Sequence, residues 1–252
     1  MRIEMILAVG LGVASPAIAP AAPPPVVAVP ATPDRVAAPV TPARTVLAHE
    51  LVGYTQPKDL MLAAVLNGWE IGEAENDNDL ARFEEIEPGL GKRIVERSKA
   101  ELMGLVAERI PQMHDRLATL FAENCTEEEL KSLIAFYGSP AGKKLVRSIT
   151  LSNKGGDAFD DEHFTAEEAT RANRDAAKDA VKTLDGDEWM AAAKFGLSPA
   201  GRLVKALSPQ VQAISAEWMT ALMADYGKRI EPAVEEMVRQ AIDKADKRPG
   251  GN

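Results

Sequence analysis

The sequence predicts an all-α protein, a multi-helix array with two similar helix-break-helix units, preceded by a disordered Pro/Ala-rich tether. Apolar residues recur at steps of three and four over most of the chain beyond Glu50, as on one face of a helix. Three capping pairs mark helix starts: Thr126 with Glu129, Thr165 with Glu168, and Asp185 with Glu188. No stretch alternates apolar and polar residues for long enough to predict a strand.

The first nineteen residues have the features of a secretory signal peptide (1–19). Arg2 gives a positive end, an uncharged apolar run follows over residues 5–14, and Ala17 to Ala19 forms an A-x-A cleavage pattern. A run of this length is too short to cross a bilayer as a helix, so we expect no transmembrane anchor after signal cleavage near Ala19. The mature protein is therefore expected to be periplasmic or secreted.

Proline separates the N-terminal part from the rest of the chain. Nine of the 17 prolines lie within the first 42 residues, and proline fixes φ and removes a backbone donor. We therefore expect a disordered Pro/Ala-rich linker over residues 20–49, which serves either as a spacer or as a mere leader. The sequence then predicts a first helical unit (50–151), a second helical unit (152–245) and a flexible tail (246–252). Whether the two units form one domain or two stays open.

Capping residues and prolines predict where individual helices begin and bend. Asp79 caps a short helix that stops at Pro88, and a long amphipathic helix follows with a kink at Pro111. Ser208-Pro209 predicts the start of a final helix, which Pro232 is expected to bend or split. A partner helix or a lipid could bind the apolar stripe of this helix, but such stripes more often face the protein's own core, which is the reading we favour.

One motif occurs twice, 59 residues apart. The first copy is Phe136-Tyr137-Gly138-Ser139-Pro140-Ala141-Gly142-Lys143, and the second is Phe195-Gly196-Leu197-Ser198-Pro199-Ala200-Gly201-Arg202. Because each copy follows a capping pair at the same distance, we interpret the two as corners of repeated helix-break-helix units.

The physical chemistry of the first copy is that of a corner between two helices. We expect a helix to end near Tyr137 with Gly138 in the left-handed conformation, after which Ser139 caps the next helix and Pro140 occupies its first turn. Gly142 lowers the helix propensity of this segment. A glycine is expected there if another backbone passes close by, because it has no Cβ atom.

The serines of the two motifs are not expected to be nucleophiles. Neither Ser139 nor Ser198 lies in a G-x-S-x-G elbow, whereas Ser-Pro at a helix start is what capping requires.

The string from Glu127 to Lys144 resembles the E-E-L…F-Y-x-S-P-x-G-x-K signature of a bacterial family called domain of unknown function 2059. The resemblance covers roughly Leu117 to Val146, and residues 187–219 are similar more weakly. It implies an exported helical protein, and it brings no activity, cofactor or catalytic residue to this chain.

Charge and cysteine content exclude several classes of function. The formal net charge of -9 disfavours binding to nucleic acid or to an anionic lipid surface. Cys125 is the single cysteine, so an internal disulfide is impossible and a buried apolar role is expected.

The acidic run from Asp157 to His163 is the best metal candidate, but such runs are more often solvated loops, and whether it binds a cation stays open. We predict no catalytic, cofactor-binding or metal-binding residue.

These observations favour a non-catalytic protein-interaction or envelope-assembly module. Its partner would be an envelope protein or a second copy of the chain. One alternative is a carrier of a lipid or small apolar ligand, suggested by Met and Ala in residues 190–193 and 219–223. A weaker alternative is an envelope hydrolase that uses carboxylates. A tunnel between the two corners would favour the carrier, and a filled core with an exposed apolar patch would favour the interaction module.

Overall fold

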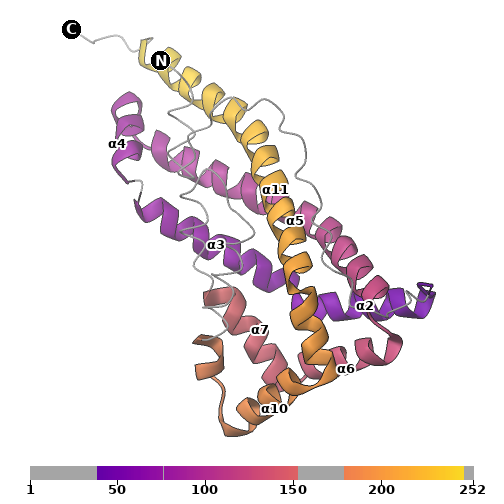
Figure 1. The fold of residues 1–252 in the computed structure, drawn as a ribbon. Helices are drawn as coiled ribbons and strands as arrows, with labels where there is room; N and C mark the ends of the chain where they lie inside the picture. The colour runs from indigo at the N-terminus through magenta and orange to yellow at the C-terminus, as the bar shows by residue number, and fades with distance from the viewer. Residues whose placement is uncertain (1–38, 76, 153–178, 247–252) are drawn as a thin grey trace.

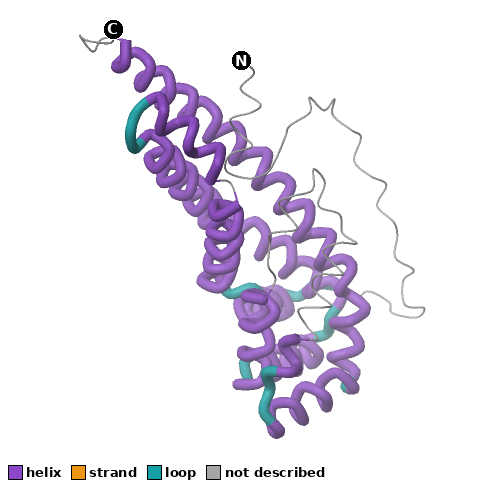
Figure 2. Tube along the Cα trace, turned by 90° about the vertical axis from the view of Figure 1, so that its left-hand side faces the viewer, coloured by secondary structure: helices purple, strands orange, loops and turns teal. Residues whose placement is uncertain are grey.

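The computed structural model describes residues 39–75, 77–152 and 179–246, and these form eight helices and no strand (Figures 1 and 2). The all-α prediction is therefore confirmed. In chain order the helices are α2 (Pro42–Thr55), α3 (Lys58–Glu75), α4 (Asp77–Ile86), α5 (Leu90–Asn124), α6 (Glu127–Tyr137), α7 (Pro140–Ser152), α10 (Gly186–Leu197) and α11 (Pro199–Asp246). The predicted signal peptide, residues 20–38 of the linker, the acidic run 157–163, the capping pair at Thr165 and the tail from residue 247 lie outside the described residues.

Helix α2 begins inside the segment predicted as linker. The side chain of Thr41 accepts a hydrogen bond from the backbone N–H of Arg44 at 3.2 Å, and Pro42 occupies the first turn. The linker prediction is therefore wrong for residues 42–49. Proline at a first helical position favours a helix rather than breaking one, and the inner side of this helix is buried, with Ala48 fully inaccessible.

Arg44 anchors α2 at the junction between α5 and α6. Its buried guanidinium donates hydrogen bonds to the carbonyl oxygens of Glu123 at 3.3 Å and Pro39 at 3.2 Å. Glu123 lies in the last turn of α5, where carbonyl groups lack helical partners and the helix dipole is negative. The Thr41 hydroxyl donates to Glu127 of α6 at 3.1 Å. The start of the described chain is thus held at this junction.

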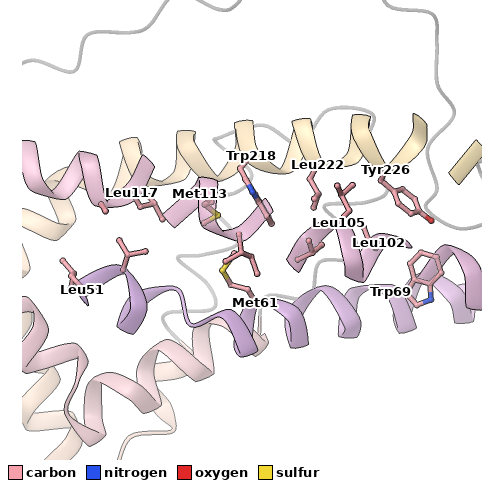
Figure 3. Close-up of a cluster of buried hydrophobic side chains, with 14 of the residues drawn as sticks. Leu51, Met61, Trp69, Leu102, Leu105, Met113, Leu117, Trp218, Leu222 and Tyr226 are labelled. Carbon is pink, nitrogen blue, oxygen red and sulfur yellow. The ribbon is translucent and has the colours of Figure 1, made fainter. Parts of the chain in front are cut away.

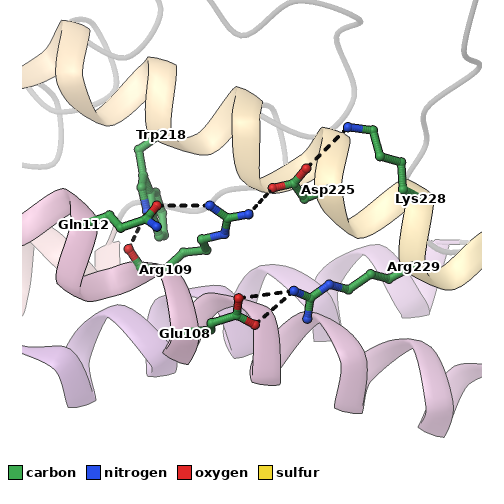
Figure 4. Close-up of polar contacts among 7 residues, drawn as sticks. All are labelled: Glu108, Arg109, Gln112, Trp218, Asp225, Lys228 and Arg229. Carbon is green, nitrogen blue, oxygen red and sulfur yellow. Dashed lines mark hydrogen bonds and ion pairs between the residues drawn. The ribbon is translucent and has the colours of Figure 1, made fainter.

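The core lies along α5, which α11 follows on one side while α2 and α3 lie on the other (Figure 3). Leu105 and Leu222 are buried at the centre of this packing. The buried ring of Trp218 donates its indole N–H to the carbonyl of Arg109 at 3.1 Å (Figure 4), which satisfies a donor that would be costly to leave unpaired. The apolar stripe of the final helix therefore faces the protein's own core, which confirms the favoured reading.

Ion pairs flank this core along the contact between α5 and α11. Arg109 pairs with Asp225, and Arg229 donates to Glu108 at 3.0 Å (Figure 4). These side chains are partly exposed, and pairs of this kind contribute about 0–1 kcal/mol each. They therefore add little stability, and the buried apolar residues dominate the packing of α11 on α5.

Two predicted helix starts differ from the observed ones. Helix α11 continues through Pro209 and Pro232, so the predicted start at Ser208-Pro209 is wrong, and Ser208 instead accepts a hydrogen bond from the Gln212 side chain at 3.2 Å. A proline inside a helix costs about 3 kcal/mol, and here the burial of the same helix against the core offsets that cost. The short helix α4 begins at Asp77 rather than after Asp79.

Candidate functional site

The first Ser-Pro corner joins α6 to α7. The Ser139 hydroxyl donates to the carbonyl of Phe136 at 2.6 Å, and its oxygen accepts from the backbone N–H of Gly142 at 3.2 Å. Ser139 thus satisfies one group from the helix before the corner and one from the helix after it. The prediction for Gly138 is wrong, because its φ of -76° is right-handed, and the turn comprises Gly138 and Ser139.

The second Ser-Pro corner joins α10 to α11 with the same hydrogen bonds. The Ser198 hydroxyl donates to the carbonyl of Phe195 at 2.6 Å and accepts from the backbone N–H of Gly201 at 3.0 Å. Arg202 adds a hydrogen bond to the carbonyl of Leu197 at 2.7 Å. Both helices that enter the corners begin with a complete capping box, as predicted from Thr126 with Glu129 and from Asp185 with Glu188.

Each corner requires a glycine one turn into its second helix. A Cβ atom at Gly142 would lie 2.1 Å from the carbonyl oxygen of Phe136, and one at Gly201 would lie 2.2 Å from that of Phe195. These distances are far below van der Waals contact. The backbone that passes close to each glycine therefore belongs to the preceding helix of the same corner.

The two corners pack against each other. The rings of Phe136 and Phe195 are stacked with centroids 3.8 Å apart and planes 2° from parallel, and Tyr137 meets both rings edge-on. Burial raises the pKa of Tyr137 to about 12. Near this stack, Lys144 of α7 pairs with Glu188 of α10 at 2.6 Å, and Lys143 lies 5.8 Å from the ring of Tyr54.

The contacts between the two helix pairs are reciprocal. Helix α6 contacts α11, and α7 contacts α10, so the first helix of each pair meets the second helix of the other (Figure 1). Equivalent phenylalanines touch each other at the centre, as in an interface related by a two-fold axis. Sequence reasoning found both corners but had no signal that they would meet.

This geometry leaves the corner serines little scope as nucleophiles. Each hydroxyl hydrogen is used toward a backbone carbonyl, whereas a nucleophilic serine donates to a base. The stacked rings also occupy the space between the corners in which an apolar ligand would have to lie.

Two histidines lie near each other, an exposed one in α2 and a half-buried one in α5. His49 of α2 is 3.9 Å from the carboxylate of Asp115, which neighbours His114 in α5. Burial lowers the pKa of His114 below 6.5, and a hydrogen bond to the Gln56 backbone partly opposes that shift. Within the described ranges no group of three His, Cys, Asp or Glu side chains could hold a metal ion. His163 lies outside those ranges.

Cys125 is buried, as the sequence predicts, and follows directly after α5. Among the helices described, none combines the length and apolar character needed to cross a bilayer.

Helix α10 exposes apolar side chains that the corner packing does not use. Trp189 is 53% exposed, Met190 63% and Leu197 78%. On a helix of 3.6 residues per turn these three positions and Ala193 fall within an arc of about 100°, while Phe195 points the other way into the stack. We call Trp189, Met190, Ala193 and Leu197 the outer face of α10. The sequence indicates the outer face only through its Met and Ala content. Because α10 is apolar on two sides, no polar boundary marks which side is exposed.

Comparison with known proteins gives one match. Residues 111–149 match a family described as uncharacterized protein conserved in bacteria (DUF2059). The chain resembles this family over α5 from Pro111, α6 and most of α7, so the match contains the whole first corner. No curated protein and no solved structure matches the chain. The resemblance to domain of unknown function 2059 is thereby confirmed, and it extends no activity to this chain.

We expect Gly142→Ala to destabilise the fold by about 3 kcal/mol, because the new methyl group would overlap the Phe136 carbonyl oxygen and force the corner open. The matched control is Gly104→Ala in α5, where a Cβ meets nothing within 4 Å, and there we expect a gain of about 0.5–1 kcal/mol. Urea unfolding measures both. Equal effects at the two positions would contradict the close approach at the corner.

We expect the free energy of unfolding to decrease as the pH falls below 6.5, in part because of His114. Its folded-state pKa is lower than 6.5, so the unfolded chain takes up the proton first, and stability is lost from pH 6.5 down to the folded-state pKa. Urea unfolding at about pH 7.5 and about pH 5.5 should show a smaller difference in His114→Gln than in the unchanged chain. His49→Gln is the control and should keep most of the difference. An unaltered difference in His114→Gln would contradict the prediction.

Proposed function

We propose that the protein is a non-catalytic interaction module of the bacterial envelope, exported by its N-terminal segment and binding protein through the outer face of α10. The observation that carries the proposal is this exposed apolar face, which lies beside a corner whose interior is filled. Large exposed apolar side chains on one helix face favour a protein-binding role, and Trp and Met are enriched in such interfaces.

The alternative functions receive less support. A carrier needs an apolar cavity, and the site proposed for it between the corners holds the stacked rings of Phe136 and Phe195.

A carboxylate hydrolase needs an acid or base free to exchange a proton. The most buried carboxylate of the described residues, Glu87, is held by Arg93 at 3.3 Å and Lys244 at 2.7 Å, which suits a structural tie between the start of α5 and the end of α11.

Export rests on the first nineteen residues and on the family resemblance. The proposed cleavage leaves a chain that starts at Pro20, with a Pro/Ala-rich stretch before Thr41 that would serve as a tether for the helical part.

We expect a cell that makes the full chain to accumulate a product that begins at Pro20 in its envelope fraction. Fractionation followed by N-terminal sequencing measures this. Ala17→Glu with Ala19→Glu should block cleavage, because the cleavage site requires small residues at both positions. An uncleaved, cytoplasmic product from the unchanged chain would contradict export.

We expect a tagged chain made in its own bacterium to recover a bound protein from envelope extract, either another protein or untagged copies of itself. Trp189→Ser with Met190→Ser should reduce that recovery by at least about tenfold, because both side chains are large, apolar and exposed on the outer face. The matched control is Val46→Ser, which removes an exposed apolar side chain from α2. Recovery unaffected by the double change, or no recovery at all, would contradict the proposed function.

A further inference from the structure

Two glycines of α10 lie beside the outer face, and the protein's own packing does not explain them. A Cβ at Gly186 or at Gly196 would meet nothing within 4 Å, in contrast to the corner glycines. Gly196 lies inside the helix, where a glycine costs about 0.5–1 kcal/mol relative to alanine, whereas Gly186 is the first residue of the helix. Both positions border the exposed Trp189, Met190 and Leu197, so the space above each glycine is open beside a large side chain.

We propose that a second copy of this chain covers the outer face, with the two α10 helices packed antiparallel around a two-fold axis. This inference rests on the proposed function and names the partner. In the heptad register with Met190 and Leu197 at one core position and Gly186 and Ala193 at the other, each large side chain meets a small residue. Met190 packs on Ala193 of the second copy, and Leu197 packs on Gly186 of the second copy. At the border of the contact, Trp189 lies over Gly196 of the second copy.

Charge favours the same register and direction. Asp187 and Lys194 are seven residues apart and lie on the same edge of the outer face, and within the described residues neither forms an ion pair. In the antiparallel register that edge meets its own copy, so Asp187 of each chain faces Lys194 of the other. A parallel pair would bring this edge against Trp189 and Gly196 instead. The two symmetric ion pairs therefore select the antiparallel arrangement.

The position of α10 leaves room for a second copy. Helix α10 lies at one end of the molecule, opposite the end where α4 and the last turns of α11 lie (Figure 1). Two copies would therefore meet end to end. Because α10 is only about 18 Å long, the contact is at the small end of protein interfaces, and we expect a weak dimer with a Kd of about 10–100 µM.

Charge exchange tests the proposal directly. The chain that starts at Pro20 should show a reversible monomer-dimer equilibrium in sedimentation experiments from about 1 µM to about 300 µM. Asp187→Lys alone and Lys194→Asp alone should each raise the Kd by at least about tenfold, because the two-fold axis creates two like-charge contacts. An equimolar mixture of these two variants should dimerise again, and so should the variant that carries both changes. A folding defect would not be repaired by mixing, so the mixture separates loss of the contact from loss of the fold.

Gly196→Ala gives a second readout, in which two effects have opposite signs. The added methyl group should stabilise the monomer by improving helix propensity, and therefore raise its Tm, yet it should weaken the dimer by filling the space that Trp189 of the second copy occupies. A monomer at every concentration would overturn the proposal, and so would a dimer that is indifferent to the charge changes. If the chain is monomeric but its recovery of another protein still depends on Trp189 and Met190, the proposed function stands and only the second copy is excluded as the partner.

Discussion

The stack between Phe136 and Phe195 determines where four of the eight described helices lie. Each ring is held by a corner in which a serine hydroxyl bonds the carbonyl of that same phenylalanine, so the ring and the turn are fixed together. Once the rings are stacked, α7 lies against α10 and α11 against α6. Helix α11 then lies along α5, and its side chains Trp218 and Leu222 are buried in the core between them. The corner glycines make this possible, since a single methyl group at either would separate the turn from its phenylalanine.

Features decided by short-range chemistry could be predicted from the sequence. The capping boxes at Thr126 and Asp185 each involve residues three apart, and the structure contains both of them. The apolar stripe of the final helix was also predictable, because helical periodicity alone determines which side chains share a face. The predicted end of the linker at residue 49 is wrong for a related reason. Its prolines predict a segment without helix, but Pro42 occupies the first turn of α2, where the missing N–H of proline has no cost.

Features decided by contacts between distant segments could not be predicted. Ser208-Pro209 predicts a helix start, but α11 is continuous across it. Burial of α11 against the core stabilises the continuous helix, and local propensity is too weak to oppose it. The meeting of the two corners depends on the path of the whole chain between them, which no local pattern encodes. The outer face of α10 was missed for the same reason. Which of its two apolar sides faces the protein follows from the position of Phe195 in the stack and from nothing within α10 itself.

The acidity of the chain limits how the outer face of α10 can act. Arg2 and Glu4 cancel within the first nineteen residues, so the chain that starts at Pro20 keeps the whole net charge of -9, and two copies repel each other at long range. Salt screens that repulsion over about 8–10 Å, whereas ion pairs partly enclosed between two helices are screened much less. A contact made of apolar side chains and two short ion pairs is therefore suited to this protein. The repulsion between the acidic bodies opposes association in every orientation, and the two ion pairs offset it only where the outer faces meet.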